Sequence, residues 1–272
     1  MADLAQLDHT VINVQFEMDR AQGLFDALGF ALTPRGYHSL GSINHLMMFG
    51  TDYMELIGLP RGAENPRKDI AEVPLGINGL VFKTSDADAT YAHMQDMGIA
   101  GEPPKSFTRP VELADGTKDA SFRTVAVRPG VFPGGRVYYC EHHTPELVWR
   151  PEWQSHGNGA LAMPEFVIAS NNHTGEAETF AKLLHADVGG AGDHLTVAFN
   201  GGQLCLMSPG AYGERYGAVA SPMAGRQSIF GALVIRTDSL DKIRKVVTPA
   251  IDDGARVVVR EGTFDAVLEF VG

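Results

Sequence analysis

The chain has 272 residues, of which 44% are hydrophobic and 20% charged, and its formal net charge is −11 at pH 7. The hydrophobic content excludes a disordered chain, and the length suits one large domain or two medium ones. The negative charge would repel nucleic-acid phosphates and anionic lipids, so we expect neither a nucleic-acid nor a membrane partner.

The cysteine content and the N-terminal sequence favour a cytoplasmic protein. Cys140 and Cys205 are the only cysteines, too few for a disulfide framework. The first nine residues carry no basic segment followed by an apolar one, so we expect no secretory signal. No apolar run is long enough to span a membrane.

Four segments have the apolar spacing of an amphipathic helix, and each lies between strand-like runs. The first helix covers Met18–Leu28, and the others follow Ser85, Thr174 and Ser239, with Ser85 as a predicted N-cap. The strand-like runs that precede the four helices are Thr10–Val14, Gly79–Lys83, Phe166–Ser170 and Ala232–Arg236. The main runs that follow them are His45–Phe49, Tyr53–Leu59, Ser121–Val127, Arg136–His142, His194–Phe199, Gln203–Met207, Arg256–Arg260 and Ala266–Val271, with a turn predicted at Asp115–Gly116.

The repeated order of strand, helix and further strands predicts an α+β fold of four βαβββ modules. We expect the modules to pair into two cup-shaped, mixed-sheet halves, residues 1–150 and 157–272, joined by a polar, turn-rich linker around residue 155. A single module leaves one sheet face bare, and pairing two modules would join the bare faces into a cup with the helices outside. A concave sheet is a natural site for a small molecule.

Strand alternation places an imidazole and a carboxylate inside the first cup. His9 shares a face with Val11 and Asn13, and Glu55 shares a face with Tyr53 on the last strand of the same module. A carboxylate in such an apolar run needs a partner. Histidine and glutamate together form part of a divalent-cation site, although a plain His–Glu hydrogen bond or an exposed glutamate explains the pattern as well.

The same residues resemble those of the glyoxalase, bleomycin-resistance and extradiol-dioxygenase superfamily, also called vicinal oxygen chelate. The resemblance rests on Leu-Asp-His-Thr-Val-Ile-Asn-Val (7–14), on Leu-Gly-Phe (28–30) at the end of the helix, on Asn-His-Leu-Met-Met-Phe-Gly (44–50) and on Tyr-Met-Glu-Leu-Ile-Gly-Leu (53–59). It is closest to the glyoxalase-like branch and covers residues 1–150 best. It implies paired βαβββ modules around a divalent metal, with His9 and Glu55 at ligand positions.

The second module departs from this pattern. Gly79 stands where His9 stands in the first module, so no ligand is available there. The last strand repeats Tyr-x-Glu as Tyr139-Cys140-Glu141, which makes Glu141 the expected third metal ligand. Alternation would direct Tyr139, Glu141 and His143 inward, whereas a one-residue slip would direct Cys140 and His142 inward instead.

Several further residues are candidates for catalysis or substrate binding. His142, His143 and His45 are the candidate catalytic histidines, and a lone strand histidine such as His45 is more often a satisfied polar group. The candidate substrate-binding residues are Tyr53, Asn44, Met47, Tyr139 and Trp149. The second half carries Glu165, Cys205 and Glu269 at comparable strand positions but no histidine on its first strands. We therefore expect a degenerate pair of modules there.

Three functions remain open from the sequence. The first is a glyoxalase-like, metal-dependent enzyme of the isomerase or lyase type, acting on a small oxygen-rich or aromatic molecule that chelates the metal. The second is a non-catalytic small-molecule binding protein for resistance or sequestration. The third is an Fe(II) extradiol-type dioxygenase, which needs a second histidine ligand. The cofactor is a divalent ion, with Zn, Ni, Mn and Fe(II) not distinguished, and a homodimer is one assembly that the sequence allows.

Overall fold

The computed structural model describes residues 5–113 and 116–272. The strands of its first half are β1 (Leu7–Gln15), β2 (Gly36–Tyr37), β3 (Ile43–Met48), β4 (Tyr53–Gly58), β5 (Gly76–Lys83), β6 (Lys105–Leu113), β7 (Gly116–Ala126) and β8 (Arg136–His142). The helices of this half are α1 (Met18–Ala27), α2 (Lys68–Ala71) and α3 (Ala87–Asp96), followed by 3-10 turns at Pro145–Leu147 and Pro151–Trp153.

The second half repeats this order of elements. Its strands are β9 (Ala160–Ser170), β10 (Val188–Ala191), β11 (His194–Phe199), β12 (Gly202–Met207), β13 (Ser228–Thr237), β14 (Ile251–Asp252), β15 (Arg256–Glu261) and β16 (Ala266–Val271). Its helices are α4 (His173–Leu184), α5 (Pro209–Tyr216) and α6 (Leu240–Val246), with a 3-10 turn at Gly217–Val219.

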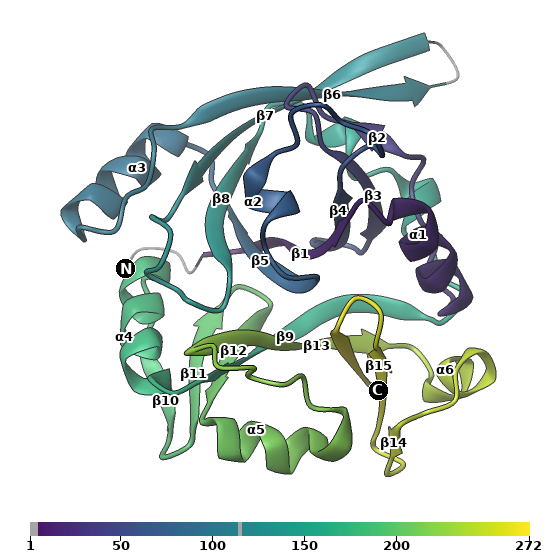
Figure 1. The fold of residues 1–272 in the computed structure, drawn as a ribbon, viewed down its shortest axis with the longest axis vertical. Helices are drawn as coiled ribbons and strands as arrows, with labels where there is room; N and C mark the ends of the chain where they lie inside the picture. Colours follow the sequence, from purple (N-terminus) through teal and green to yellow (C-terminus); the bar gives the residue numbers. More distant parts are fainter. Residues whose placement is uncertain (1–4, 114–115) are drawn as a thin grey trace.

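Each half forms one curved, mixed sheet with the first strands of its two modules at the centre. The strand orders are β2-β3-β4-β1-β5-β8-β7-β6 and β10-β11-β12-β9-β13-β16-β15-β14. The two central strands pair antiparallel, and each pairs parallel with the last strand of its own module. The predicted α+β fold of four βαβββ modules in two cup-shaped halves is therefore confirmed, and both modules of each cup come from one chain (Figure 1).

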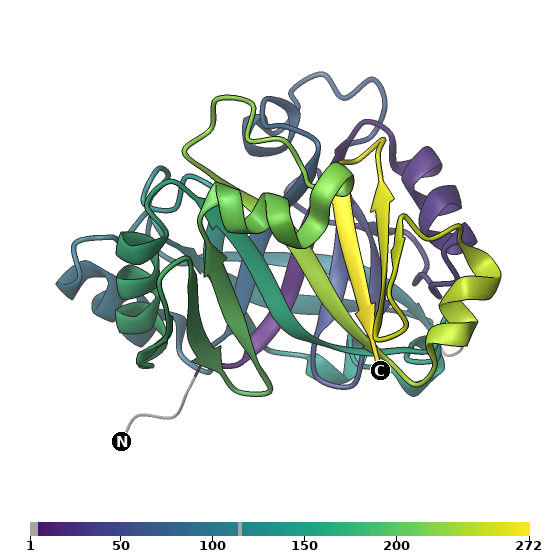
Figure 2. The ribbon, with the colours of Figure 1, turned by 90° about the horizontal axis from the view of Figure 1, so that it is seen from below.

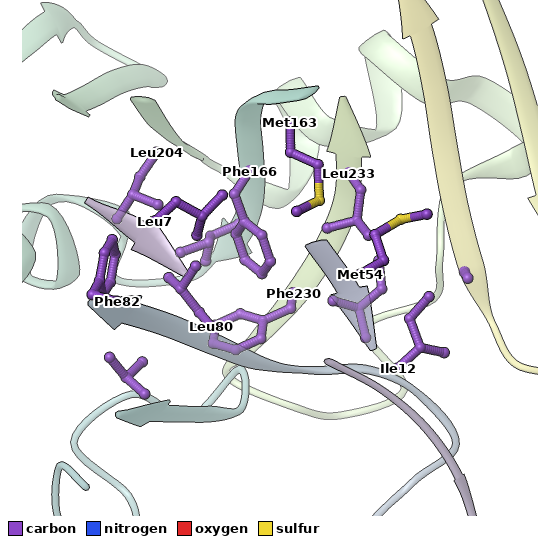
Figure 3. Packing of buried hydrophobic residues seen from close by; sticks show 14 of the residues in the cluster. Leu7, Ile12, Met54, Leu80, Phe82, Met163, Phe166, Leu204, Phe230 and Leu233 are labelled. Carbon is purple, nitrogen blue, oxygen red and sulfur yellow. The ribbon is translucent and has the colours of Figure 1, made fainter. Parts of the chain in front are cut away.

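The two sheets pack against each other through their outer, convex faces. Figure 3 shows this core from close by, with Leu80 and Phe82 of β5 facing Phe166 of β9 and Phe230 of β13. These side chains are almost completely buried. The sequence predicts helices over the outer faces, whereas much of that covering is the sheet of the opposite half.

The concave faces of the two sheets point away from each other, and they are filled differently. In the first half the four-residue helix α2 lies in the cup and places Ile70 in its floor (Figure 1). In the second half α5 lies across the strands, with α4 and α6 to the sides (Figure 2), and buries Tyr212 and Tyr216 in the sheet. An open cavity of about 650 Å³ remains in the first cup.

The predicted helices all form, with small differences at their ends. The second one is capped by Asp86 rather than Ser85, because the Asp86 carboxylate accepts hydrogen bonds from the backbone N–H groups of Asp88 and Ala89. The short helices α2 and α5 are not expected from the sequence. Asp115 of the predicted turn lies outside the described residues. No helix in the described ranges is long and apolar enough to cross a membrane.

Asp52, in the turn between β3 and β4, connects the two halves and makes the stability of the folded chain depend on pH. Its Oδ1 accepts a 3.2 Å hydrogen bond from the backbone N–H of Met163. Burial raises the pKa of Asp52 to about 6 from the ordinary value of 3.8, because its hydrogen bonds and the charge of Lys83 offset the loss of water only in part. The folded chain therefore holds this proton more tightly than the unfolded chain and loses stability as the pH rises through this interval.

We expect Asp52→Asn to gain stability relative to the wild type as the pH rises from about 4 to 6, by up to about 3 kcal/mol, since asparagine keeps the acceptor but cannot ionise. Urea unfolding of both proteins across this interval measures the difference. Asp26→Asn on the exposed side of α1 controls for loss of a carboxylate as such. A difference between Asp52→Asn and the wild type that stays constant with pH would contradict the prediction.

Candidate functional site

A cavity of about 650 Å³ occupies the first cup, between the concave sheet, α2 and the loops at its mouth. This volume falls in the range of small-molecule binding pockets. Its walls include polar residues of β1, β3, β4 and β8 and the aromatic rings of Phe107 and Phe122, whose centroids are 5.0 Å apart. The cavity is therefore able to hold a molecule with both a polar and an apolar part.

Three polar side chains converge in the cavity wall: His9, Glu55 and Tyr138. His9 Nε2 lies 3.6 Å from Glu55 Oε2 and 3.3 Å from the Tyr138 hydroxyl. Both His9 and Glu55 are about 95% shielded from solvent, since their exposed fractions are 4% and 5%. The His9 ring also stacks on Tyr53, with centroids 4.4 Å apart. The sequence placed His9, Glu55 and Tyr53 in the cup, and all three line it.

A bulge in β1 brings Asp8 onto the same side as His9. Leu7 pairs with Phe82 and His9 with Val81, so Asp8 is an extra residue between two successive pairs. The fully buried Asp8 carboxylate accepts hydrogen bonds from His9 Nδ1 at 2.5 Å and from His142 Nε2 at 2.9 Å. Burial alone would raise the pKa of Asp8, but the bonds from His142 and His9 outweigh it and hold the pKa well below its usual range.

Because ionised Asp8 can only accept, the proton of the neutral His9 ring sits on Nδ1. The Nε2 lone pair is then directed at the cavity, where it accepts from Tyr138 or can bind an ion. This is the arrangement that orients metal-binding histidines in proteins, with a carboxylate behind the ring.

Asp8 also belongs to the one group of three metal-type ligands found within 4.8 Å of one another in the described residues, namely Asp8, Cys140 and His142. Its carboxylate is already taken up by two imidazole N–H groups. Burial raises the pKa of Cys140 well above its usual value, so the thiol is neutral in the absence of an ion. Through these hydrogen bonds the group holds the His9 ring in place from the side opposite the cavity.

Glu55 is held by a chain of hydrogen bonds that begins at Ser42. The Asn44 amide donates to Glu55 Oε1 at 2.7 Å and to His38 Nε2 at 3.3 Å, and His38 Nδ1 donates to the Ser42 hydroxyl at 2.8 Å. Burial lowers the pKa of His38 to about 4, so its ring is neutral and can accept from Asn44. These bonds leave Glu55 Oε2 directed towards His9.

The alternation predicted for β8 is wrong. Tyr138 and Cys140 line the cup and His142 shares their face, whereas Tyr139, Glu141 and His143 lie on the other face. Glu141 accepts a hydrogen bond from Ala87 N–H at the start of α3 and lies 3.8 Å from His143. Glu141 therefore does not join His9 and Glu55, and His143 is not in the cup.

The cause of this error is the register of the strands rather than their identity. Val11 pairs with Glu55 in the first module, and the equivalent pairing in the second module joins Val81 to Tyr138. Tyr138 therefore stands where Glu55 stands, three residues before Glu141. Tyr139 instead packs into the core between the sheets and donates to Leu183 O.

Three other candidate residues lie outside the cavity wall. His45 donates to Thr33 O at 2.7 Å and accepts from Arg35 Nε, so it is the satisfied polar residue that the sequence allowed as an alternative. Met47 lies in the core between the sheets. Trp149 packs behind the wall, with its ring 4.9 Å from His142 and 5.7 Å from Tyr53. Asn44, by contrast, does line the cavity.

Sequence reasoning misses Asp8, Tyr138, His38 and Arg109. A bulge has no sequence signature in this strand, so strict alternation directs Asp8 away from His9. Tyr138 is found only from the register of β5 and β8. Arg109 lies in β6, which carries too little apolar alternation to be recognised as a strand.

The second cup holds an ion-pair network in place of a cavity. Glu165, which occupies the His9 position, is 2.7 Å from Arg215 Nη1 of α5, and Glu269 is 2.9 Å from Arg215 Nη2. The Tyr216 hydroxyl also donates to Glu269. Arg256 Nη1 lies 3.4 Å from Glu269 Oε1, so two guanidinium groups, those of Arg215 and Arg256, offset the charges of Glu165 and Glu269. This half has no cup-facing histidine among its described residues.

The comparisons with known proteins agree with this architecture. A family model described as a glyoxalase-like domain matches residues 7–184. The chain therefore belongs to the glyoxalase-like domain family, within the vicinal oxygen chelate superfamily. A search of curated protein sequences found no match.

Solved structures of very different sequence share the fold. A hypothetical protein from Staphylococcus aureus matches with a TM-score of 0.71 at 11% identity, over 98% of this chain and 99% of that one. A triple mutant of 4-hydroxymandelate synthase from Streptomyces coelicolor gives 0.60 at 14% identity, over 99% and 93% of the two chains. A fusion of a xylose isomerase-like TIM barrel with 4-hydroxyphenylpyruvate dioxygenase gives 0.60 at 12% identity, over 99% of this chain and 49% of that one.

We expect Arg215→Met to destabilise the protein by about 3 kcal/mol, because it leaves the poorly solvated Glu165 carboxylate without an ion pair and Glu269 with Arg256 alone. Urea unfolding measures the change. Arg244→Met is the matched control, because Arg244 also pairs with two aspartates, Asp241 and Asp252, but at the surface. Equal losses of stability in the two variants would show that the buried network contributes no more to stability than the surface ion pairs of Arg244.

Proposed function

We propose that this protein is a metal-dependent enzyme of the glyoxalase-like type, acting on a small oxygen-rich or aromatic molecule by isomerase or lyase chemistry. The observation that carries the proposal is the pair formed by His9 Nε2 and Glu55 Oε2 in the wall of the cavity. We assign these two atoms as protein ligands of a divalent ion, with the Tyr138 hydroxyl beside them.

The donor atoms fit such an ion. Two ligand atoms that are each about 2.1 Å from one tetrahedral ion lie about 3.4 Å apart, close to the 3.6 Å between His9 Nε2 and Glu55 Oε2. That separation is too long for a good hydrogen bond. Asp8 on one side and Asn44 on the other occupy the remaining polar atoms of the two ligands. Each ligand thus keeps one free atom, directed towards the other.

The surrounding residues have distinct parts in the proposed activity. A bound divalent ion would supply Lewis-acid polarisation of substrate oxygens. Asp8 fixes the tautomer of His9, and Asn44 fixes the orientation of Glu55. Burial raises the pKa of Tyr138 far above its usual value, so its hydroxyl stays protonated and can donate to a substrate oxygen. Phe107 and Phe122 form an apolar wall that excludes water from the bound molecule.

A binding protein without turnover is the second candidate, and Gly79 favours it. A Cβ on Gly79 would lie 2.6 Å from the Val11 Cβ, so the close approach of β1 and β5 leaves no room for a ligand side chain from β5. An extradiol dioxygenase has less support, because it needs a second histidine next to Glu55. His142 donates to Asp8, and His38 reaches Glu55 only through Asn44.

Glu55→Gln should weaken the binding of Zn, Mn, Ni or Fe(II), whichever ion the wild type retains, by more than about 100-fold, the upper range for loss of a supporting residue. Elemental analysis and isothermal titration measure this. Cys140→Ser is the matched control and should keep the metal, because Cys140 belongs only to the group around Asp8. Metal loss in Cys140→Ser with retention in Glu55→Gln would move the site to that group, and a wild type that binds none of these ions would refute a metal enzyme.

Chelation separates the enzyme from the binding protein. If the ion is resident, removing it should lower the melting temperature, because an ion that binds only the folded chain stabilises it by mass action. Differential scanning calorimetry before and after treatment with EDTA measures the shift. An unchanged melting temperature, together with a rise on addition of small aromatic compounds, would favour binding without metal.

A further inference from the structure

Arg109 of β6 is a buried cation in the cup without an ion-pair partner among the described residues. It is 3% exposed, it lines the cavity, and its Nη2 is shielded from solvent without a hydrogen-bond partner. Its guanidinium forms no ion pair within 4.0 Å to any carboxylate in the described residues. By contrast, Arg67 and Arg136 in the same cavity share Asp69, at 2.6 and 3.0 Å. A buried, unpaired charge destabilises the folded chain, and an anionic ligand would offset that loss.

The position of Arg109 is set by a seam where the curved sheet nearly closes on itself. β6 meets β2 here, and Ser39 N–H donates to Thr108 O at 2.9 Å. A Cβ on Gly36 would lie 2.5 Å from Arg109 Cδ and 2.2 Å from Asn44 Oδ1. Glycine at position 36 is therefore what allows the arginine and the amide to lie together in the wall.

Asn44 Oδ1 is the second unpartnered polar atom at this point. The Asn44 amide nitrogen is fixed by Glu55 and His38, so its oxygen must point away from them, and it is buried without a donor. An unused donor, Arg109 Nη2, and an unused acceptor, Asn44 Oδ1, thus lie on one side of the cavity. Because Asn44 also donates to Glu55, these two unused groups lie beside the pair formed by Glu55 and His9.

The rest of the cavity agrees with an anionic ligand. Its lining carries six cationic side chains, Arg67, Lys105, Arg109, Arg128, Arg136 and Arg226, against three acidic ones, Glu55, Asp69 and Glu102. This excess of positive charge occurs on a chain whose net charge is −11. The apolar wall at Phe107 and Phe122 offers a surface for a flat hydrophobic group.

We propose that the cup binds an organic monocarboxylate with an aromatic body, and that the Arg109 guanidinium receives the carboxylate. Arginine suits this role because its planar donors match the two carboxylate oxygens. The ring lies against Phe107 and Phe122, which leaves the part next to the carboxylate towards His9 and Glu55. This inference names the substrate class of the cavity to which the proposed function belongs. Only the reaction of the bound molecule rests on that function, whereas the binding itself does not.

The test uses acid and amide pairs of equal shape on metal-free protein. The probes are 3-phenylpropanoate with 3-phenylpropanamide, and 2-naphthylacetate with 2-naphthylacetamide. Titration calorimetry after EDTA treatment and dialysis excludes binding of the carboxylate to a metal. We expect the wild type to bind at least one acid more than tenfold tighter than its amide. In Arg109→Gln the affinity for the acid should fall to the affinity for the amide, while the affinity for the amide itself stays unchanged.

Arg128→Gln is the matched control, since it removes another cationic residue of the cavity lining and should keep most of the preference for the acid. Arg109→Met should also raise the melting temperature of the ligand-free protein, because it removes a buried, unpaired charge. No saturable binding of either acid, equal affinity for acid and amide in the wild type, or a preference that survives in Arg109→Gln would overturn the proposal. Because these measurements need no metal, their outcome is independent of whether His9 and Glu55 hold an ion.

Discussion

The packing of the two convex sheet faces against each other is the constraint on which the rest of this structure depends. Each sheet has one apolar outer face, and the core shared by Phe82, Phe166 and Phe230 satisfies both sheets at once. That layer is mainly apolar, because a polar group buried there needs a partner, as the Tyr139 hydroxyl has in Leu183 O. The polar residues of the candidate site lie instead on the concave face of the first sheet, and the concave faces of the two sheets point in opposite directions. A concave face is therefore where this fold offers a site for a small molecule, and each half has one concave face.

Within the first cup, the orientation of the polar groups depends on Asp8. Its carboxylate lies between two imidazoles, and the bonds from His142 and His9 keep it ionised despite complete burial. An aspartate that followed the regular alternation of β1 would face the apolar core instead. The bulge thus converts a residue that would be costly in the core into a support for His9. Asp8 also occupies the space behind the His9 ring. The Nε2 atom, on the cavity side, is therefore the atom of the ring that is left to bind a ligand.

Much of the fold was predictable because it depends on local pattern. Apolar spacing and turn residues locate four helices and the strands around them, and their repeated order gives the two cups. His9 and Glu55 were predictable for the same reason, since regular alternation places each on the cup-facing side of its strand, β1 or β4. The register between β5 and β8 depends instead on contacts between distant segments, and a Tyr-x-Glu repeat suggested the wrong one. Asp8 and Arg109 depend on a bulge and on a seam between edge strands, which no single segment reveals.

The two cups differ in what lies over the carboxylates of their concave faces. In the second cup Arg215 of α5 pairs with Glu165 and Glu269, and Tyr212 and Tyr216 fill the space around it. In the first cup the corresponding connection forms only the short helix α2, and a cavity remains. Part of this difference lies in the segment between the paired modules, and part in the sheets, where Glu165 stands at the position of His9.

That difference has a consequence for how such a chain can change over evolutionary time. The connection between modules runs over the mouth of its cup, so its length and sequence can vary without disturbing the core between the sheets. A duplicated half can thus become a scaffold, by acquiring a helix that closes it, while the other half keeps an accessible interior. In this topology the segment that connects the two modules of a half helps to determine whether that half keeps an open cavity.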